Sequence, residues 1–190
     1  MKRGVVGAMA LLALCSCGNR VDSTWMPLAK GSEWKYQVQN GMQNSVDALR
    51  VESQELVDGE DGWRLSGPGG PSRLVWRDGG LYASQLAGTR FSPSILLMAD
   101  LKEPQFKFEW KGDVMVAHRA LQATSVTTME EDSVNLSGKD VKARKSNVVI
   151  KLGKSEITVQ TWFAKGVGIV RQEERSGDLL LRSMEYISGP

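Results

Sequence analysis

Apolar and polar residues alternate along most of the chain from Trp25 onward, in short runs separated by Gly, Pro and Asp. The clearest run is Phe106-Lys107-Phe108-Glu109-Trp110-Lys111, with three aromatic residues at one parity and three charged residues at the other. Residues 33–38, 148–152 and 157–163 show the same alternation. Successive side chains of a β-strand point to opposite faces, so a period of two predicts strands with one buried face.

Glycine-containing breaks separate these runs and predict hairpin turns. Asp78-Gly79-Gly80 stands between two apolar runs, and Gly tolerates the positive φ that tight hairpins require. Further predicted turns lie at Asp58-Gly59, Lys111-Gly112-Asp113, Ser137-Gly138, Leu152-Gly153 and Ser176-Gly177. We expect about nine or ten antiparallel strands and at most one or two short helices, with residues 94–101 as the best helical segment.

A large antiparallel sheet with one apolar face has to cover that face by closing, curling or adding a second layer. We expect a mainly β fold in which the sheet curls into an incomplete barrel, with a β-sandwich as the alternative. Aromatic residues are the predicted occupants of the concave face. The candidates are Trp34, Tyr36, Phe106, Phe108, Trp110 and Phe163.

The N-terminus differs from the rest of the chain. Basic Met1-Lys2-Arg3 precedes an apolar run of about ten residues, which is too short to span a bilayer and is typical of a signal peptide. Leu14-Cys15-Ser16-Cys17 resembles the bacterial lipobox, in which a Leu, a variable residue and a small residue precede the lipidated cysteine. The resemblance implies cleavage before Cys17 and lipidation of Cys17, which becomes the new N-terminus. An ordinary secretory signal with incidental cysteines is the alternative.

We therefore expect a signal peptide at residues 1–16, a lipidated cysteine and tether at 17–24, and a single antiparallel β domain at 25–190. Removal of residues 1–16 takes away Lys2 and Arg3 and leaves 22 basic and 22 acidic residues. Such a neutral chain lacks the basic excess of nucleic-acid-binding proteins. In enterobacteria-like systems an Asp after the lipidated cysteine retains the protein in the inner membrane. The Gly at position 18 therefore favours the outer membrane, facing the periplasm.

No residue set predicts catalysis, a metal site or a cofactor. The chain has two cysteines and one histidine, His118, which are too few for a typical zinc site. The acidic run Glu130-Glu131-Asp132 lacks the shaped loop of oxygen ligands that calcium requires. A Gly-Val-Gly at residues 166–168 lacks the third glycine of a dinucleotide fingerprint. The paired carboxylates of a hydrolase remain an alternative, because the fold and not the distance in sequence brings two carboxylates together.

A basic stretch follows the acidic run. We interpret it as a solvated strand face, with contact to anionic lipid headgroups or an acidic partner as the functional alternative. Its members are Lys139, Lys142, Arg144, Lys145, Lys151 and Lys154.

Two segments resemble those of uncharacterised bacterial lipoproteins. Residues 26–36 are similar to their opening P-L-x-x-G-x-x-W-x-Y, and residues 161–170 resemble W-F-A-x-G-V-G-x-V near their C-termini. The resemblance implies an antiparallel β domain with Trp34 and Tyr36 facing inward and a tight turn at Gly166 and Gly168. The curled sheet is similar to the half-barrels of the periplasmic lipoprotein carrier and receptor (LolA and LolB type), whose concave face takes up acyl chains.

These observations lead to a functional hypothesis: a lipid-anchored, non-enzymatic protein of the bacterial envelope whose β domain binds a hydrophobic ligand or lipid. The alternative is an assembly protein that scaffolds another envelope protein.

Overall fold

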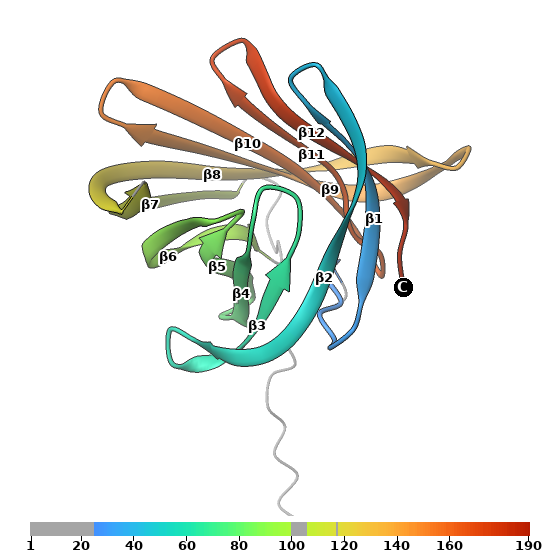
Figure 1. The fold of residues 1–190 in the computed structure, drawn as a ribbon, viewed down its shortest axis with the longest axis horizontal. Coiled ribbons are helices and arrows are strands. Elements are labelled where there is room, and N and C mark those ends of the chain that lie inside the picture. The colour runs from blue at the N-terminus through green and yellow to red at the C-terminus, as the bar shows by residue number, and fades with distance from the viewer. Residues whose placement is uncertain (1–24, 100–105, 117) are drawn as a thin grey trace, which may run out of the picture.

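The computed structural model describes residues 25–99, 106–116 and 118–190, and within these it contains twelve β-strands and no α-helix (Figure 1). In this part of the chain there is accordingly no helix of the length and hydropathy needed to cross a membrane. The strands are β1 (Glu33–Asn40), β2 (Gln43–Val57), β3 (Glu60–Ser66), β4 (Ser72–Arg77), β5 (Gly80–Leu86), β6 (Thr89–Ala99), β7 (Phe106–Val116), β8 (Arg119–Leu136), β9 (Lys139–Leu152), β10 (Ser155–Ala164), β11 (Gly168–Ser176) and β12 (Leu179–Ser188).

All neighbouring strands are antiparallel, and the first strand pairs with the last, so the sheet is a closed barrel. The β1–β12 ladder runs from Lys35 opposite Ser188 to Asn40 opposite Arg182. The predicted mainly antiparallel β class is confirmed, whereas the incomplete barrel, the sandwich alternative and the count of nine or ten strands are wrong. Pairing β1 with β12 satisfies the backbone groups that both strands would otherwise leave open at a sheet edge.

The period-two pattern of the sequence corresponds to the inner and outer faces of this barrel. In β1, Trp34, Tyr36 and Val38 are buried, and the residues between them are exposed. Five of the six predicted turns, at residues 58–59, 78–79, 137–138, 153–154 and 177–178, join consecutive strands. Alternation therefore predicted which residues form the core, and the glycine breaks predicted where five of the hairpins turn.

The sixth predicted turn is wrong, because Lys111-Gly112-Asp113 lies inside β7. A Cβ atom at position 112 would stand 2.3 Å from the backbone oxygen of Ser92 in β6. Gly112 thus allows two strand backbones to approach closely and does not turn the chain.

The predicted helix at residues 94–101 is also wrong over its described part, because residues 94–99 belong to β6. Pairing of β6 with β7 spans residues 90–92 and ends before Pro93, which has no N–H to donate. Beyond Pro93, the Thr127 hydroxyl of β8 donates to the Leu96 carbonyl at 3.1 Å, and the Ser146 hydroxyl of β9 donates to that of Leu97. The end of β6 therefore lies against the inner faces of β8 and β9.

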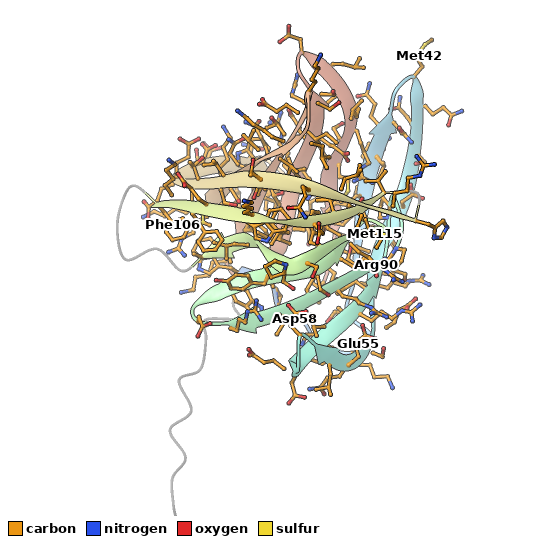
Figure 2. The ribbon with its side chains drawn as sticks, turned by 90° about the vertical axis from the view of Figure 1, so that its left-hand side faces the viewer. Met42, Glu55, Asp58, Arg90, Phe106 and Met115 are labelled. Carbon is orange, nitrogen blue, oxygen red and sulfur yellow. The ribbon has the colours of Figure 1, made fainter. Side chains whose placement is uncertain are left out.

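The barrel end where β1 begins is filled by the segment before it, and we call it the closed end. Met26 is fully buried, and its carbonyl accepts a hydrogen bond of 3.3 Å from the Trp76 indole. Trp25 lies under the Arg144 guanidinium, 4.4 Å from ring centroid to Cζ. The opposite end carries the β1–β2, β3–β4, β5–β6, β9–β10 and β11–β12 turns. Figure 2 places Phe106 and Met115 at opposite ends of β7, Met115 on the side of these turns.

The two segments that carry the lipoprotein resemblance meet at the closed end. The Trp34 indole donates to the Val167 carbonyl at 2.6 Å, and the Tyr36 hydroxyl donates to the Ile169 carbonyl at 3.0 Å. Both contacts reach past β12, which lies between β1 and β11. Burial, followed by the neighbouring Tyr186, raises the pKa of Tyr36 well above its ordinary value, so its hydroxyl remains a donor.

Tyr36→Phe tests the energetic weight of this connection. The substitution keeps the ring but leaves the buried Ile169 carbonyl without its donor, so the free energy of unfolding should fall by about 1–2 kcal/mol. Urea denaturation followed by fluorescence measures the change. Tyr82→Phe is the matched control, because no hydrogen bond of the Tyr82 hydroxyl is found among the described residues. Equal losses in the two variants would contradict the assigned role.

Candidate functional site

An apolar cavity lies inside the barrel above the closed end. It is narrow, with a volume of about 50 Å³ open to the centre of a water-sized sphere. Its walls are largely aliphatic and come from β2 to β6 on one side and from β9 to β12 on the other. Examples are Leu49, Leu65, Leu74, Ile95, Val148, Ile150 and Met184.

A second hollow borders the cavity. Phe91, Ile150, Val159 and Gln172 line both spaces. The outer hollow, with about 300 Å³ open to the centre of a water-sized sphere, is bordered by Val116, Leu152 and Ile157 and by the β5–β6 turn. We call this opening the mouth. This outer hollow lies toward the end opposite to the one that Met26 and Trp34 fill.

Polar groups on the cavity wall are bonded to one another. The Gln172 amide donates to the Thr161 hydroxyl at 3.0 Å, and both residues are buried. The Ser72 hydroxyl accepts from the Ala87 N–H at 3.0 Å. Groups satisfied in this way do not need a polar ligand, so the wall as a whole favours an apolar occupant.

One ion pair stands at the mouth. Arg182 of β12 donates from Nη2 to Oε2 of Glu174 at 2.9 Å and from Nη1 to the Pro68 carbonyl at 3.0 Å. Both side chains border the outer hollow. Arg182 thereby connects β11 and β12 with the β3–β4 turn across the opening.

The structure distributes the six predicted concave-face aromatics over four places. Phe163 lines the cavity, and Trp34 and Tyr36 fill the closed end. Trp110 is buried against Phe91, 6.1 Å between ring centroids, and its indole donates to the Pro93 carbonyl at 3.0 Å. The remaining two, Phe106 and Phe108, are half-buried on β7.

Sequence reasoning missed the aliphatic lining as a site. The signal was present in the runs at residues 148–152 and 157–163, whose alternate members point into the barrel. These runs predicted strands, but the pattern does not distinguish a wall that borders a cavity from one that borders packed side chains.

The predicted basic stretch does not form one face. Lys139 and Lys142 are exposed near the β8–β9 turn, whereas Lys154 lies in the β9–β10 turn at the other end of β9. Lys145 pairs with Glu130 at 3.2 Å and Lys151 with Glu156 at 3.7 Å. The acidic run of β8 lies directly beside the basic part of β9, with Glu130 opposite Lys145 and Glu131 opposite Arg144.

A second, smaller apolar cluster lies on the outer face around Trp162, with Ala143, Ala164 and Val170. Charged groups surround its indole ring. Arg171 lies 4.8 Å and Lys145 5.3 Å from the ring centroid, and the indole N–H donates to Asp132 at 2.8 Å.

Glu173 joins two arginines beside this cluster. Its carboxylate accepts from Arg171 Nε at 3.2 Å and from Arg175 Nη2 at 3.0 Å. Burial alone would raise the pKa of Glu173, but the hydrogen bonds and charges of the two arginines outweigh burial and hold the pKa below its ordinary value.

No group of three or more His, Cys, Asp or Glu residues suited to a metal ion is found within residues 25–99, 106–116 and 118–190. His118 is exposed in the β7–β8 turn. The lipobox residues Leu14, Ser16 and Cys17 lie outside the described residues.

No protein-family model matches the chain, and no curated protein matches it. Solved structures do share the fold. A "putative lipoprotein" from Parabacteroides distasonis superposes with a TM-score of 0.54 at 12% identity, over 88% of this chain and 98% of that one. The predicted resemblance to bacterial lipoproteins with an antiparallel β domain is thus confirmed at the level of the fold.

Two weaker similarities were also found. The "hypothetical lipoprotein YmcC" from Escherichia coli gives a TM-score of 0.44 at 10% identity, over 89% of each chain. A "putative exported protein with YmcC-like fold" from Bacteroides fragilis gives 0.43 at 11% identity, over 85% of this chain and 96% of its own.

Glu173→Gln tests the electrostatics of the outer cluster. A carboxyl whose pKa is lowered by folding stabilises the native state above its unfolded pKa, and this contribution disappears as the pH falls through the folded pKa. The variant should therefore be less stable than the parent near pH 7, and the difference should shrink below about pH 4.

Urea unfolding at pH 7, 5 and 3 measures this dependence. Glu109→Gln is the control, because the Lys107–Glu109 pair is exposed and such pairs contribute little. A stability difference for Glu173→Gln that stays constant with pH would contradict the argument.

Proposed function

We propose that this protein is a lipid-anchored component of the bacterial envelope whose barrel binds a hydrophobic ligand, specifically a single acyl chain. The observation that carries the proposal is the narrow aliphatic cavity that opens at one end of the barrel. Each methylene group moved from water into such a space contributes about 0.8 kcal/mol of binding free energy. An acyl chain of ordinary length therefore gains enough free energy to stay bound.

The shape and chemistry of the cavity support a chain rather than a compact polar molecule. The wall is aliphatic, and the hydrogen bonds of Gln172, Thr161 and Ser72 are made within the protein. Apolar cavities of this kind are poorly hydrated and take up hydrocarbon.

Other observations support the proposed lipid anchor at Cys17. Leu14, Ser16 and Cys17 match the lipobox pattern, and the Parabacteroides protein that shares the fold is described as a lipoprotein. Two or three acyl chains on Cys17 would give firm anchoring, where one chain is marginal. We propose attachment to the outer membrane, with the domain in the periplasm.

Val159→Trp tests the cavity. Val159 borders both hollows, so an indole at this position should fill the passage and reduce ligand occupancy at least about tenfold. Native mass spectrometry of protein from mild extraction should show a bound lipid-sized mass in the parent and little of it in the variant. Thr158→Trp, at the adjacent position that points to the other face, should keep the ligand. A parent protein that carries and takes up no lipid would overturn the proposed function.

Cys17→Ser tests the anchor. This change should abolish fatty-acid labelling and membrane retention in cells, because Cys17 supplies the sulfur that is lipidated. Cys15→Ser should leave both intact, since the proposed cleavage removes Cys15. Loss of label in the Cys15 variant alone would show that the assignment is wrong.

A further inference from the structure

We infer that Arg182 binds the head of the ligand, and that the ligand is a single-chain amphiphile with an anionic carboxylate or phosphate head. The inference rests on the proposed function, because it places the acyl chain in the cavity and the head at the mouth. Three features of Arg182 support this role: its position in the barrel, its contacts with the β3–β4 turn, and the charges around it.

The position of Arg182 is unusual for a charged residue, because it points into the barrel. It stands opposite Asn40 of β1 and two residues before Met184, which lines the cavity. Glu174 has the same orientation on β11, opposite Val159 and two residues after the buried Gln172. A chain lying between Val159 and Met184 would end beside these two side chains.

The β3–β4 turn holds the Arg182 guanidinium in place. Pro68 supplies an acceptor, and a Cβ atom at Gly69 would lie only 1.8 Å from Nη1 of Arg182. Gly69 also has a φ of +84°, which other residues rarely adopt. The neighbouring Pro71 carbonyl accepts from the Gly88 N–H at 2.8 Å, which holds this turn against the β5–β6 turn. The guanidinium is thus fixed at the mouth by shape and by hydrogen bonds.

The charge balance at the mouth favours an anionic head. The Arg182 side chain is 15% exposed and that of Glu174 is 27% exposed, so Glu174 can be released to water at lower cost than Arg182. The Arg182 guanidinium has five N–H donors, of which the contacts to Glu174 and Pro68 use two. A carboxylate or phosphate group can therefore replace Glu174 and accept two parallel hydrogen bonds from the guanidinium, one on each of two oxygens.

The test compares three probes with the same 16-carbon chain: the free fatty acid, its methyl ester and the lysophosphatidic acid. Purified full-length protein is titrated with each probe and occupancy is followed by native mass spectrometry. The acid or the phosphate should bind at least about tenfold more tightly than the ester. The tighter of the two anions identifies the source of the head.

Variants then assign the preference to Arg182. Arg182→Gln should remove the preference by weakening the two anions, with ester binding within about twofold of the parent. Glu174→Gln should strengthen anion binding, because it removes the competing carboxylate, and it retains the guanidinium if Arg182→Gln fails to fold. Arg175→Gln is the control: Arg175 pairs with Glu173 on the opposite face of β11 from Glu174, and its loss should change none of the affinities.

The outcomes separate the two proposals. Equal binding of acid, phosphate and ester by the parent, or equal weakening of all three by Arg182→Gln, would overturn the head-binding role and leave the hydrophobic cavity intact. Failure of all three probes to bind would overturn the proposed function itself.

Discussion

The pairing of β1 with β12 is the interaction on which the rest of the structure depends. An antiparallel sheet of this size has two edges and one apolar face, and joining its first and last strands removes both problems at once. The cost is the entropy of bringing together segments more than a hundred residues apart. Complete burial of Trp34 and Tyr36, and their hydrogen bonds to Val167 and Ile169, offsets that cost where the ladder closes.

Much of the fold could be predicted, because its local part depends on a period of two and on glycine at tight turns. Runs such as residues 33–38 and 106–111 predicted strands, and five of the six turns are where the glycine signals placed them. Closure could not be predicted, because strand curvature and the pairing of distant ends leave no local pattern. The predicted helix at residues 94–99 and the predicted turn at Gly112 were wrong for a related reason. In each case a contact with another strand, which the sequence does not show, determines the conformation.

The candidate site was less predictable than the fold. The prediction placed six aromatic residues on the concave face. Of these six only Phe163 borders the cavity, whose other walls are mainly aliphatic. Charged runs were harder still. Glu173 and Glu174 are adjacent and chemically alike, but one joins two arginines near the outer cluster and the other points into the mouth. Without apolar neighbours at alternate positions, the sequence does not show which of two equal residues faces inward.

The closed end has a consequence for how the proposed ligand would enter and leave the barrel. Among the described residues, Met26, Trp34 and Tyr36 fill that end, and the hollow that borders the cavity lies toward the other end. If the barrel holds an acyl chain as proposed, a chain that enters tail first would leave head first along the same path. Loading and unloading of the proposed ligand would then be successive events at one place. An acceptor of that ligand would contact its head at the rim formed by the β3–β4 and β11–β12 turns.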